Sequence, residues 1–168
     1  MQLFEFSLAG VIRVSGEDAL PYLQSQLTIN LNQIPVLGTR PGLRLSLKGK
    51  VLFGAQVVRT GEEEYLLVCR DTPAHRVIGL LEENIVADEV EFTDLSNHWK
   101  LSSLFHPSSM NEILAISGIR ELSTNEARQI EKGWAFLNPS LPGKSLSFLH
   151  PADSSHPWPN DLLTADST

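Results

Sequence analysis

Two lysines flank a glycine in the short polar segment Lys48-Gly49-Lys50, where they could bind an anion. Apolar residues alternate with other residues on both sides of the segment, over residues 43–47 and 51–56. This pattern predicts a β-hairpin in which each strand buries one face, with Gly49 free to adopt a positive φ at the tip. Such a tip presents ammonium groups and backbone N–H groups to an anion. A solvated turn is the simpler alternative, because lysine is common in exposed turns.

A row of polar side chains near the end of the first predicted helix forms a second candidate. Gln24, Gln26, Thr28 and Asn30 follow one another at every second position. Together with the hairpin tip, their amide and hydroxyl groups can line a cleft for a heteroaromatic ligand that donates and accepts hydrogen bonds. The exposed face of an amphipathic helix explains the same row without a ligand.

The other reactive side chains show no catalytic or metal-binding pattern. No two of the five histidines have the i, i+4 spacing of a helical metal site, and one cysteine excludes both a multi-cysteine metal site and an internal disulfide. Cys69 lies in an apolar segment, which predicts a buried, inert thiol. The acidic runs 62–64 and 82–83 are expected to be solvated. We therefore predict no metal site.

Length and composition limit the class of protein. The chain has 168 residues, 42% of them apolar, which is enough for a folded core. A net charge of −7 argues against direct nucleic-acid binding. No apolar run reaches the ~20 residues of a membrane span, and no signal peptide follows Met1. These features predict a soluble, cytoplasmic protein that does not bind membranes.

The periodicity also predicts the elements that position the candidate groups. Helices are expected from about Asp18 to Asn30, with Pro21 tolerated in the first turn, and from Thr72 as N-cap to about Asn84. Strands are expected near residues 3–6, 11–14, 43–47, 51–58, 65–69 and 90–92. The order predicts an α+β fold, in which two helices cover one mostly antiparallel sheet of the split β-α-β type.

The pattern weakens towards the C-terminus, and we predict two domains, residues 1–97 and 98–168. In the second region, residues 99–101 and 113–116 are predicted to be strands. Residues 123–133 are predicted to form a short helix that ends at Gly133. Five prolines between Pro139 and Thr168 predict an irregular, loose tail.

Three stretches together resemble a known family. Residues 14–19 with 23–28 resemble its first strand-and-helix signature, residues 47–51 its hairpin turn, and residues 130–133 its I-E-x-G segment. The family is that of the folate-binding YgfZ-like proteins, relatives of the glycine-cleavage aminomethyltransferase (T protein). The resemblance extends over residues 8–95 and, more thinly, over 125–165.

The resemblance implies a T-protein N-terminal-like domain that binds tetrahydrofolate and supports iron–sulfur cluster assembly or repair, and through it tRNA modification. The pteridine and its glutamate tail would lie in a cleft beside the first domain. By this resemblance, Lys48 and Lys50 would hold the anionic tail, Gly49 would shape the turn between them, and Gln26 and Thr28 would line the cleft. Iron–sulfur assembly proteins would be the partners.

Departures from the family argue against catalysis. The K-G-C-Y-x-G-Q-E run with its reactive cysteine is absent, and the transferase aspartate after the hairpin turn is replaced by Phe53-Gly54. We therefore predict no catalytic residue, and an aminomethyltransferase is the least favoured alternative. The family's C-terminal barrel is also missing, which suggests a truncated protein. A non-catalytic interaction module that self-associates, or that a second chain completes, is the main alternative.

Overall fold

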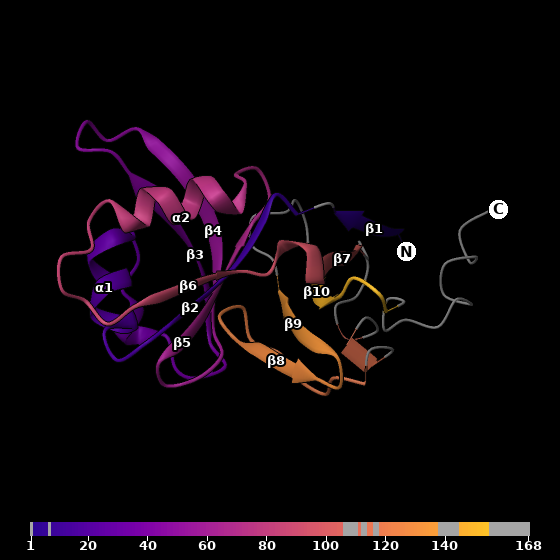
Figure 1. Cartoon of the computed structure of the whole chain (residues 1–168). Coiled ribbons are helices and arrows are strands. Elements are labelled where there is room, and N and C mark those ends of the chain that lie inside the picture. Colours follow the sequence, from indigo (N-terminus) through magenta and orange to yellow (C-terminus); the bar gives the residue numbers. More distant parts are fainter. Residues whose placement is uncertain are drawn as a thin grey trace. The chain divides into compact units, whose positions relative to one another are not determined.

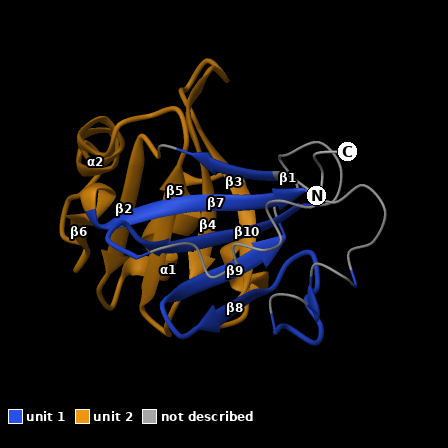
Figure 2. Cartoon of the chain, turned by 90° about the vertical axis from the view of Figure 1, so that its right-hand side faces the viewer, with its two compact units in different colours: residues 1–7, 98–168 blue, residues 8–97 orange. Residues whose placement is uncertain are grey.

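The computed structural model describes residues 2–6, 8–105, 111, 114–115, 118–137 and 145–154. Within them, two α-helices accompany two five-stranded antiparallel sheets, so the predicted α+β class is confirmed. The chain forms two compact units, Leu8–Asn97 and Met1–Ser7 with His98–Thr168 (Figure 2). The division into functional domains at residue 97 stays a prediction.

The sheet of the Leu8–Asn97 unit, whose strands are labelled in Figure 1, has the strand order β3-β4-β5-β2-β6 according to its hydrogen-bond pairing. Its strands are β2 (Gly10–Ser15), β3 (Thr39–Leu45), β4 (Val51–Arg59), β5 (Glu64–Cys69) and β6 (Glu91–Asp94). Alternate residues of the central strands, such as Ile12, Val57 and Leu67, are fully buried in one core with the two helices. Val11, Leu66 and Val68, on the other face of these strands, are buried as well, so the apolar pattern located the strands but did not distinguish a single buried face.

The first helix, α1, spans Ala19–Gln26 and is shorter than predicted. Pro21 lies in its first turn, as expected. The helix ends at Leu27, which has an extended backbone, because the next residue joins the edge of β3. There the Thr28 amide donates to the Leu43 carbonyl at 2.9 Å, and the Leu43 amide donates to Thr28 Oγ1 at 3.1 Å. Pairing with a strand thus ends the helix before Asn30.

The second helix, α2, spans Ala74–Glu82 and packs Val77 and Leu81 into the same core. Its N-cap is Pro73, with no side-chain capping bond, so the prediction of Thr72 as N-cap is off by one residue. The Tyr22 hydroxyl of α1 donates to the Leu81 carbonyl and ties the two helices together. Neither helix in this part of the chain has the length and hydropathy to span a membrane.

The second unit contains a sheet in the order β1-β7-β10-β9-β8. Its strands are β1 (Gln2–Phe6), β7 (Trp99–Phe105), β8 (Ala127–Ile130), β9 (Gly133–Leu137) and β10 (Ser145–Pro151). The expectation that residues 3–6 join the same sheet as residues 11–14 is wrong, because β1 pairs with β7. Apolar strand residues alone do not specify which partner a strand chooses.

Two further predictions fail in this unit. Residues 123–133 do not form a helix; β8 and β9 form a hairpin there, and Gly133 has φ +150. A Cβ at Gly133 would lie 2.0 Å from the Leu149 carbonyl oxygen of β10, so this close approach requires glycine. Residues 145–151 are not a loose tail, because β10 lies between β7 and β9 and is buried from Ser145 to His150.

Part of the predicted C-terminal structure lies outside the described residues. Residues 113 and 116 of the predicted strand 113–116 lie outside the described residues, while Leu114 and Ala115 are helical. Residues 138–144 and 155–168 of the predicted tail also lie outside them.

Candidate functional site

An open pocket of about 810 Å³ lies in the Leu8–Asn97 unit, between the end of α1, the β3–β4 hairpin and the end of α2. Its wall consists of Ser25, Gln26, Leu27, Thr28, Arg44, Leu45, Ser46, Leu47, Lys48, Leu52, Glu83 and Asn84. The wall therefore combines amides and hydroxyls, three leucines of the hairpin, two cations and one carboxylate. This mixture suits a ligand with an apolar ring system and charged or polar substituents.

Three of the five predicted site residues, Gln26, Thr28 and Lys48, lie in this wall. Gln26 Oε1 accepts a hydrogen bond from Asn84 Nδ2 at 3.3 Å, so its amide connects the ends of the two helices. Thr28 Oγ1 accepts from the Leu43 amide, as described above. Because an accepting hydroxyl keeps its own proton, the Thr28 O–H can still donate to a ligand.

The hairpin tip holds the other two predicted residues. Gly49 adopts φ +74, the positive value expected from the sequence. Its amide donates to the Ser46 carbonyl at 2.9 Å, and the Lys50 amide donates to Ser46 Oγ at 3.1 Å. These two amides are therefore not available to an anion, contrary to the prediction, and the tip can offer the lysine ammonium groups. Lys50 and Gly49 are adjacent to the pocket wall but do not line it.

No described carboxylate lies within ion-pair distance of Lys48 or Lys50, and both side chains are exposed. The hairpin around them is unusually apolar for an exposed segment: Leu47 is fully exposed, and Leu43, Leu45 and Val51 are 42%, 37% and 59% exposed. The expectation that these leucines face the core is wrong, because the hairpin projects beyond the helices (Figure 1). The tip thus presents cations beside apolar surface.

Arg44 is a cationic pocket residue that sequence reasoning missed. Its Nη1 donates to the Gln26 carbonyl at 3.3 Å, which fixes the guanidinium against the end of α1. Its Nε is buried and has no hydrogen-bond acceptor among the described residues. Burial raises the pKa of the Tyr22 phenol, and the nearby charge of Arg44 partly opposes that rise. An arginine between two leucines in a strand pattern gave no sequence signal for this position.

The two outer members of the polar row, Gln24 and Asn30, support the loop that follows α1. Gln24 Oε1 accepts from the Leu31 amide at 2.7 Å, and Asn30 Oδ1 accepts from the Asn32 amide at 3.1 Å. These bonds cap the short 3-10 helix Leu31–Gln33. The row therefore divides into two pocket residues and two structural caps.

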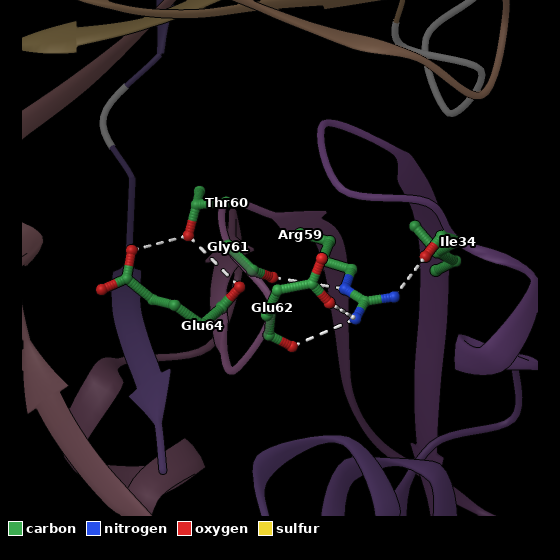
Figure 3. Close-up of polar contacts among 6 residues, drawn as sticks. All are labelled: Ile34, Arg59, Thr60, Gly61, Glu62 and Glu64. Carbon is green, nitrogen blue, oxygen red and sulfur yellow. Dashed lines mark hydrogen bonds and ion pairs between the residues drawn. The ribbon is translucent and has the colours of Figure 1, made fainter. Parts of the chain in front are cut away.

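The acidic run 62–64 forms a bonded turn rather than a purely solvated one (Figure 3). Arg59 donates to the carbonyls of Ile34, Gly61 and Glu62, and its Nη2 lies 3.2 Å from Glu62 Oε2. Glu64 Oε1 accepts from Thr60 Oγ1 at 2.7 Å. All of these bonds lie within the turn or its neighbouring loop, so the cluster is structural.

Two other groups have reactive side chains but no access to solvent. Burial raises the pKa of the Cys69 thiol to about 12, which makes it a poor nucleophile, in line with its predicted inertness. Ser102 Oγ lies 2.7 Å from His150 Nε2, yet the two residues are 0% and 2% exposed. This pair is 48 positions apart in sequence, and no sequence pattern indicates it. Over the described residues, no cluster of three or more metal-ligating side chains occurs.

Comparison with known proteins agrees with this architecture. The family described as the GCVT N-terminal domain matches residues 1–132. An aminomethyltransferase of Saccharopolyspora erythraea is 33% identical over 122 residues, which are 73% of this chain and 33% of that protein. The chain therefore spans about a third of the length of this relative.

Two solved structures share the fold. The glycine cleavage system aminomethyltransferase T from Bartonella henselae superposes with a TM-score of 0.76 at 20% identity, over 89% of this chain and 42% of that chain. The heterotetrameric sarcosine oxidase from Corynebacterium sp. U-96 gives a TM-score of 0.59 at 17% identity, over 89% of this chain and 74% of that chain. The predicted kinship with aminomethyltransferases is thus confirmed, and the protein belongs to the GCVT N-terminal domain family.

Proposed function

We propose that this protein is a folate-binding module that takes up tetrahydrofolate in the pocket beside the β3–β4 hairpin. The observation that carries the proposal is the pocket wall, which brings Gln26 and Thr28 at the end of α1 together with Lys48 of the β3–β4 hairpin. Amide and hydroxyl groups match the donors and acceptors of a pteridine, and cations match the carboxylates of its glutamate tail. The volume of about 810 Å³ is ample for a ligand of this size.

We further propose a non-catalytic role of the YgfZ-like type, in iron–sulfur cluster assembly or repair and, through it, tRNA modification in the cytoplasm. The three resembling stretches support this assignment. In addition, Phe53 occupies the strand position after the hairpin turn and is 2% exposed in the apolar core. A buried phenylalanine offers no carboxylate for one-carbon transfer, so aminomethyltransferase activity is not proposed.

Calorimetric titration with tetrahydrofolate and its polyglutamate form tests the proposal. Removing Lys48 and Lys50 together should weaken polyglutamate binding about three- to tenfold, because each exposed lysine–carboxylate pair contributes ~0.2–1 kcal/mol. The loss should shrink as salt is added. The matched control is Lys100→Ala/Lys132→Ala, which removes the same charge from two exposed lysines of the other unit.

The outcomes separate specific binding from general charge attraction. Equal losses in the two double variants would show that the lysines act only through net charge. Absence of binding to the wild-type chain at millimolar ligand would contradict the folate assignment.

An interaction module is the second candidate function, and the exposed apolar hairpin favours it. Leu43, Leu45, Leu47 and Val51 lie within nine residues of sequence and are all exposed. Such a surface promotes self-association or binding of a completing chain. If this candidate is correct, the chain should self-associate at tens of micromolar, Leu47→Asp should restore the monomer, and folate should have no effect. A monomeric wild-type chain in sedimentation would count against it.

A further inference from the structure

We propose that Arg44, and not the lysine pair at the hairpin tip, is the primary anchor for the carboxylate end of the ligand. This inference rests on the proposed function, because it assigns a residue to the anionic part of a folate. Three observations at Arg44 support it: a position in the pocket wall, a guanidinium restrained by one hydrogen bond, and donors that no described residue satisfies.

The position of Arg44 is set by the sheet. Arg44 lies in β3 opposite Phe53 of β4. The pairing register shifts immediately after it, between Arg44 and Leu45. The bond from Nη1 to the Gln26 carbonyl then holds the guanidinium against α1. A side chain that is already held in place loses less entropy on binding than an exposed lysine does. Arg44 is therefore better preorganised than Lys48 or Lys50.

The hydrogen-bonding state of Arg44 indicates the class of ligand. Nη1 is used, but no described residue accepts from Nε or Nη2, and Nε is buried. A buried donor without an acceptor is unfavourable until one is supplied. The Nε and Nη2 donors form a planar fork that matches the two oxygens of a carboxylate. Because Nε is buried, the side chain must turn this edge toward the pocket on binding, so the single bond from Nη1 restrains the guanidinium without locking it.

The charges around Arg44 leave it available to an anion. The Tyr22 phenol carries no charge at neutral pH, as is usual for tyrosine, and burial raises its pKa further. Glu83 is the one carboxylate in the pocket wall, and it forms no ion pair with Arg44. Within the described residues, the guanidinium is thus not neutralised.

Arg13 provides a matched control in the same sheet. Its Nε is also buried without an acceptor in the described part of the chain, and its Nη2 donates to Thr93 Oγ1 at 3.3 Å. It does not line the pocket. An unsatisfied Nε occurs at both arginines, so it does not by itself mark a ligand anchor; Arg44 differs in lining the pocket and in having no described acceptor for Nη2.

The experiment compares tetrahydrofolate with p-aminobenzoylglutamate, which keeps the carboxylates and lacks the pteridine. Calorimetry would be run on wild type, Arg44→Gln, Arg44→Lys and Arg13→Gln, with thermal unfolding to confirm that each variant is folded. Arg44→Gln should weaken both ligands at least about tenfold, because a charge-assisted bidentate contact is lost. Arg44→Lys should fall in between, and Arg13→Gln should bind as wild type does.

Each outcome decides a separate point. Unchanged tetrahydrofolate affinity in Arg44→Gln overturns the anchor and leaves the proposed function standing. Arg44-dependent binding of p-aminobenzoylglutamate alone supports the anchor and overturns the folate assignment. Binding of neither ligand to wild type overturns both. If Arg44→Gln does not fold, Arg44→Lys decides: affinity equal to that of wild type overturns the anchor, and a loss of several-fold supports it.

Discussion

Strand β4 connects two charged turns. In one turn the cation is hydrogen-bonded within the fold, and in the other the cations are exposed. At the end of β4, Arg59 donates to three backbone carbonyls and to the Glu62 carboxylate (Figure 3). Its guanidinium also lies 5.7 Å from the centre of the Tyr65 ring. At the start of β4, Lys48 and Lys50 are exposed and form no ion pair with any described residue. Both turns look similar in sequence, since each is short, polar and charged.

The difference separates structural cations from candidate binding cations. The N–H donors of Arg59 form hydrogen bonds within the folded chain, and its side chain is only 13% exposed. The lysines, and Arg44 beside them, retain donors that the fold does not use. We infer that charge alone does not identify a binding residue; the decisive property is hydrogen-bonding capacity left over after folding.

The largest expected effect is at the structural turn. Arg59→Ala should lower the free energy of unfolding by about 2–3 kcal/mol, because several charge-assisted hydrogen bonds are lost and carbonyls lose their donors. Urea denaturation measures this change. Arg76→Ala, at an exposed position of α2, serves as the control and should change stability by less than about 0.5 kcal/mol. Similar small losses in both variants would remove the distinction between the two turns.

Alkaline pH should destabilise the fold through β5, the strand that follows the structural turn. The Cys69 pKa is raised from 9.0 to about 12, so the unfolded thiol ionises first and stability falls as pH rises from 9.0 towards 12. At pH 10 the loss should be about 1.4 kcal/mol relative to neutral pH. Burial also raises the pKa of Tyr65, against an opposing effect of Arg59, which adds a loss above pH 10.0. Urea midpoints at both pH values test this, and Cys69→Ala should flatten the dependence.

Replacing the glycine of each turn by alanine should change stability by different amounts, and this difference is smaller than the effect expected at Arg59. Gly49 has φ +74 with open space around its Cβ position, so Gly49→Ala should cost ~1 kcal/mol through backbone strain alone. Gly61 has no positive φ, and a Cβ there would meet Glu64 Cβ at an ordinary 3.5 Å. Gly61→Ala should therefore be nearly neutral. Thermal unfolding of the two variants measures the difference, and a costly Gly61→Ala would contradict the assigned turn geometry.

The smallest effect on stability is expected at the hairpin tip. Lys48→Ala/Lys50→Ala should change the free energy of unfolding by less than about 0.5 kcal/mol, because exposed cations without partners contribute little to folding. Denaturation of this variant beside Arg59→Ala gives the direct comparison. A large destabilisation would show that the lysines support the fold, and would remove the reason to regard them as binding residues.

The sequence was informative where structure is local. Alternating or continuous apolar residues located the strands of the Leu8–Asn97 unit, and Pro21 lies in the first turn of α1 as predicted. Gln26, Thr28 and Lys48 were also chosen from sequence, and they line one pocket. Prediction failed where a distant strand decided the outcome. The helix predicted from the capping residues at 123–126 does not form, because β9 pairs with β10 instead.

By itself, the sequence determined the α+β class, the kinship with aminomethyltransferases and the positive φ of Gly49. Only the tertiary structure decided which cations are used by the fold. Arg59 donates to the Ile34 carbonyl, 25 positions away, and Arg44 donates to the Gln26 carbonyl, 18 positions away. The remaining donors of Arg44 have no acceptor among the described residues. The physical reason is that these acceptors are backbone groups, identical at every residue, so the sequence does not reveal where folding will bring them.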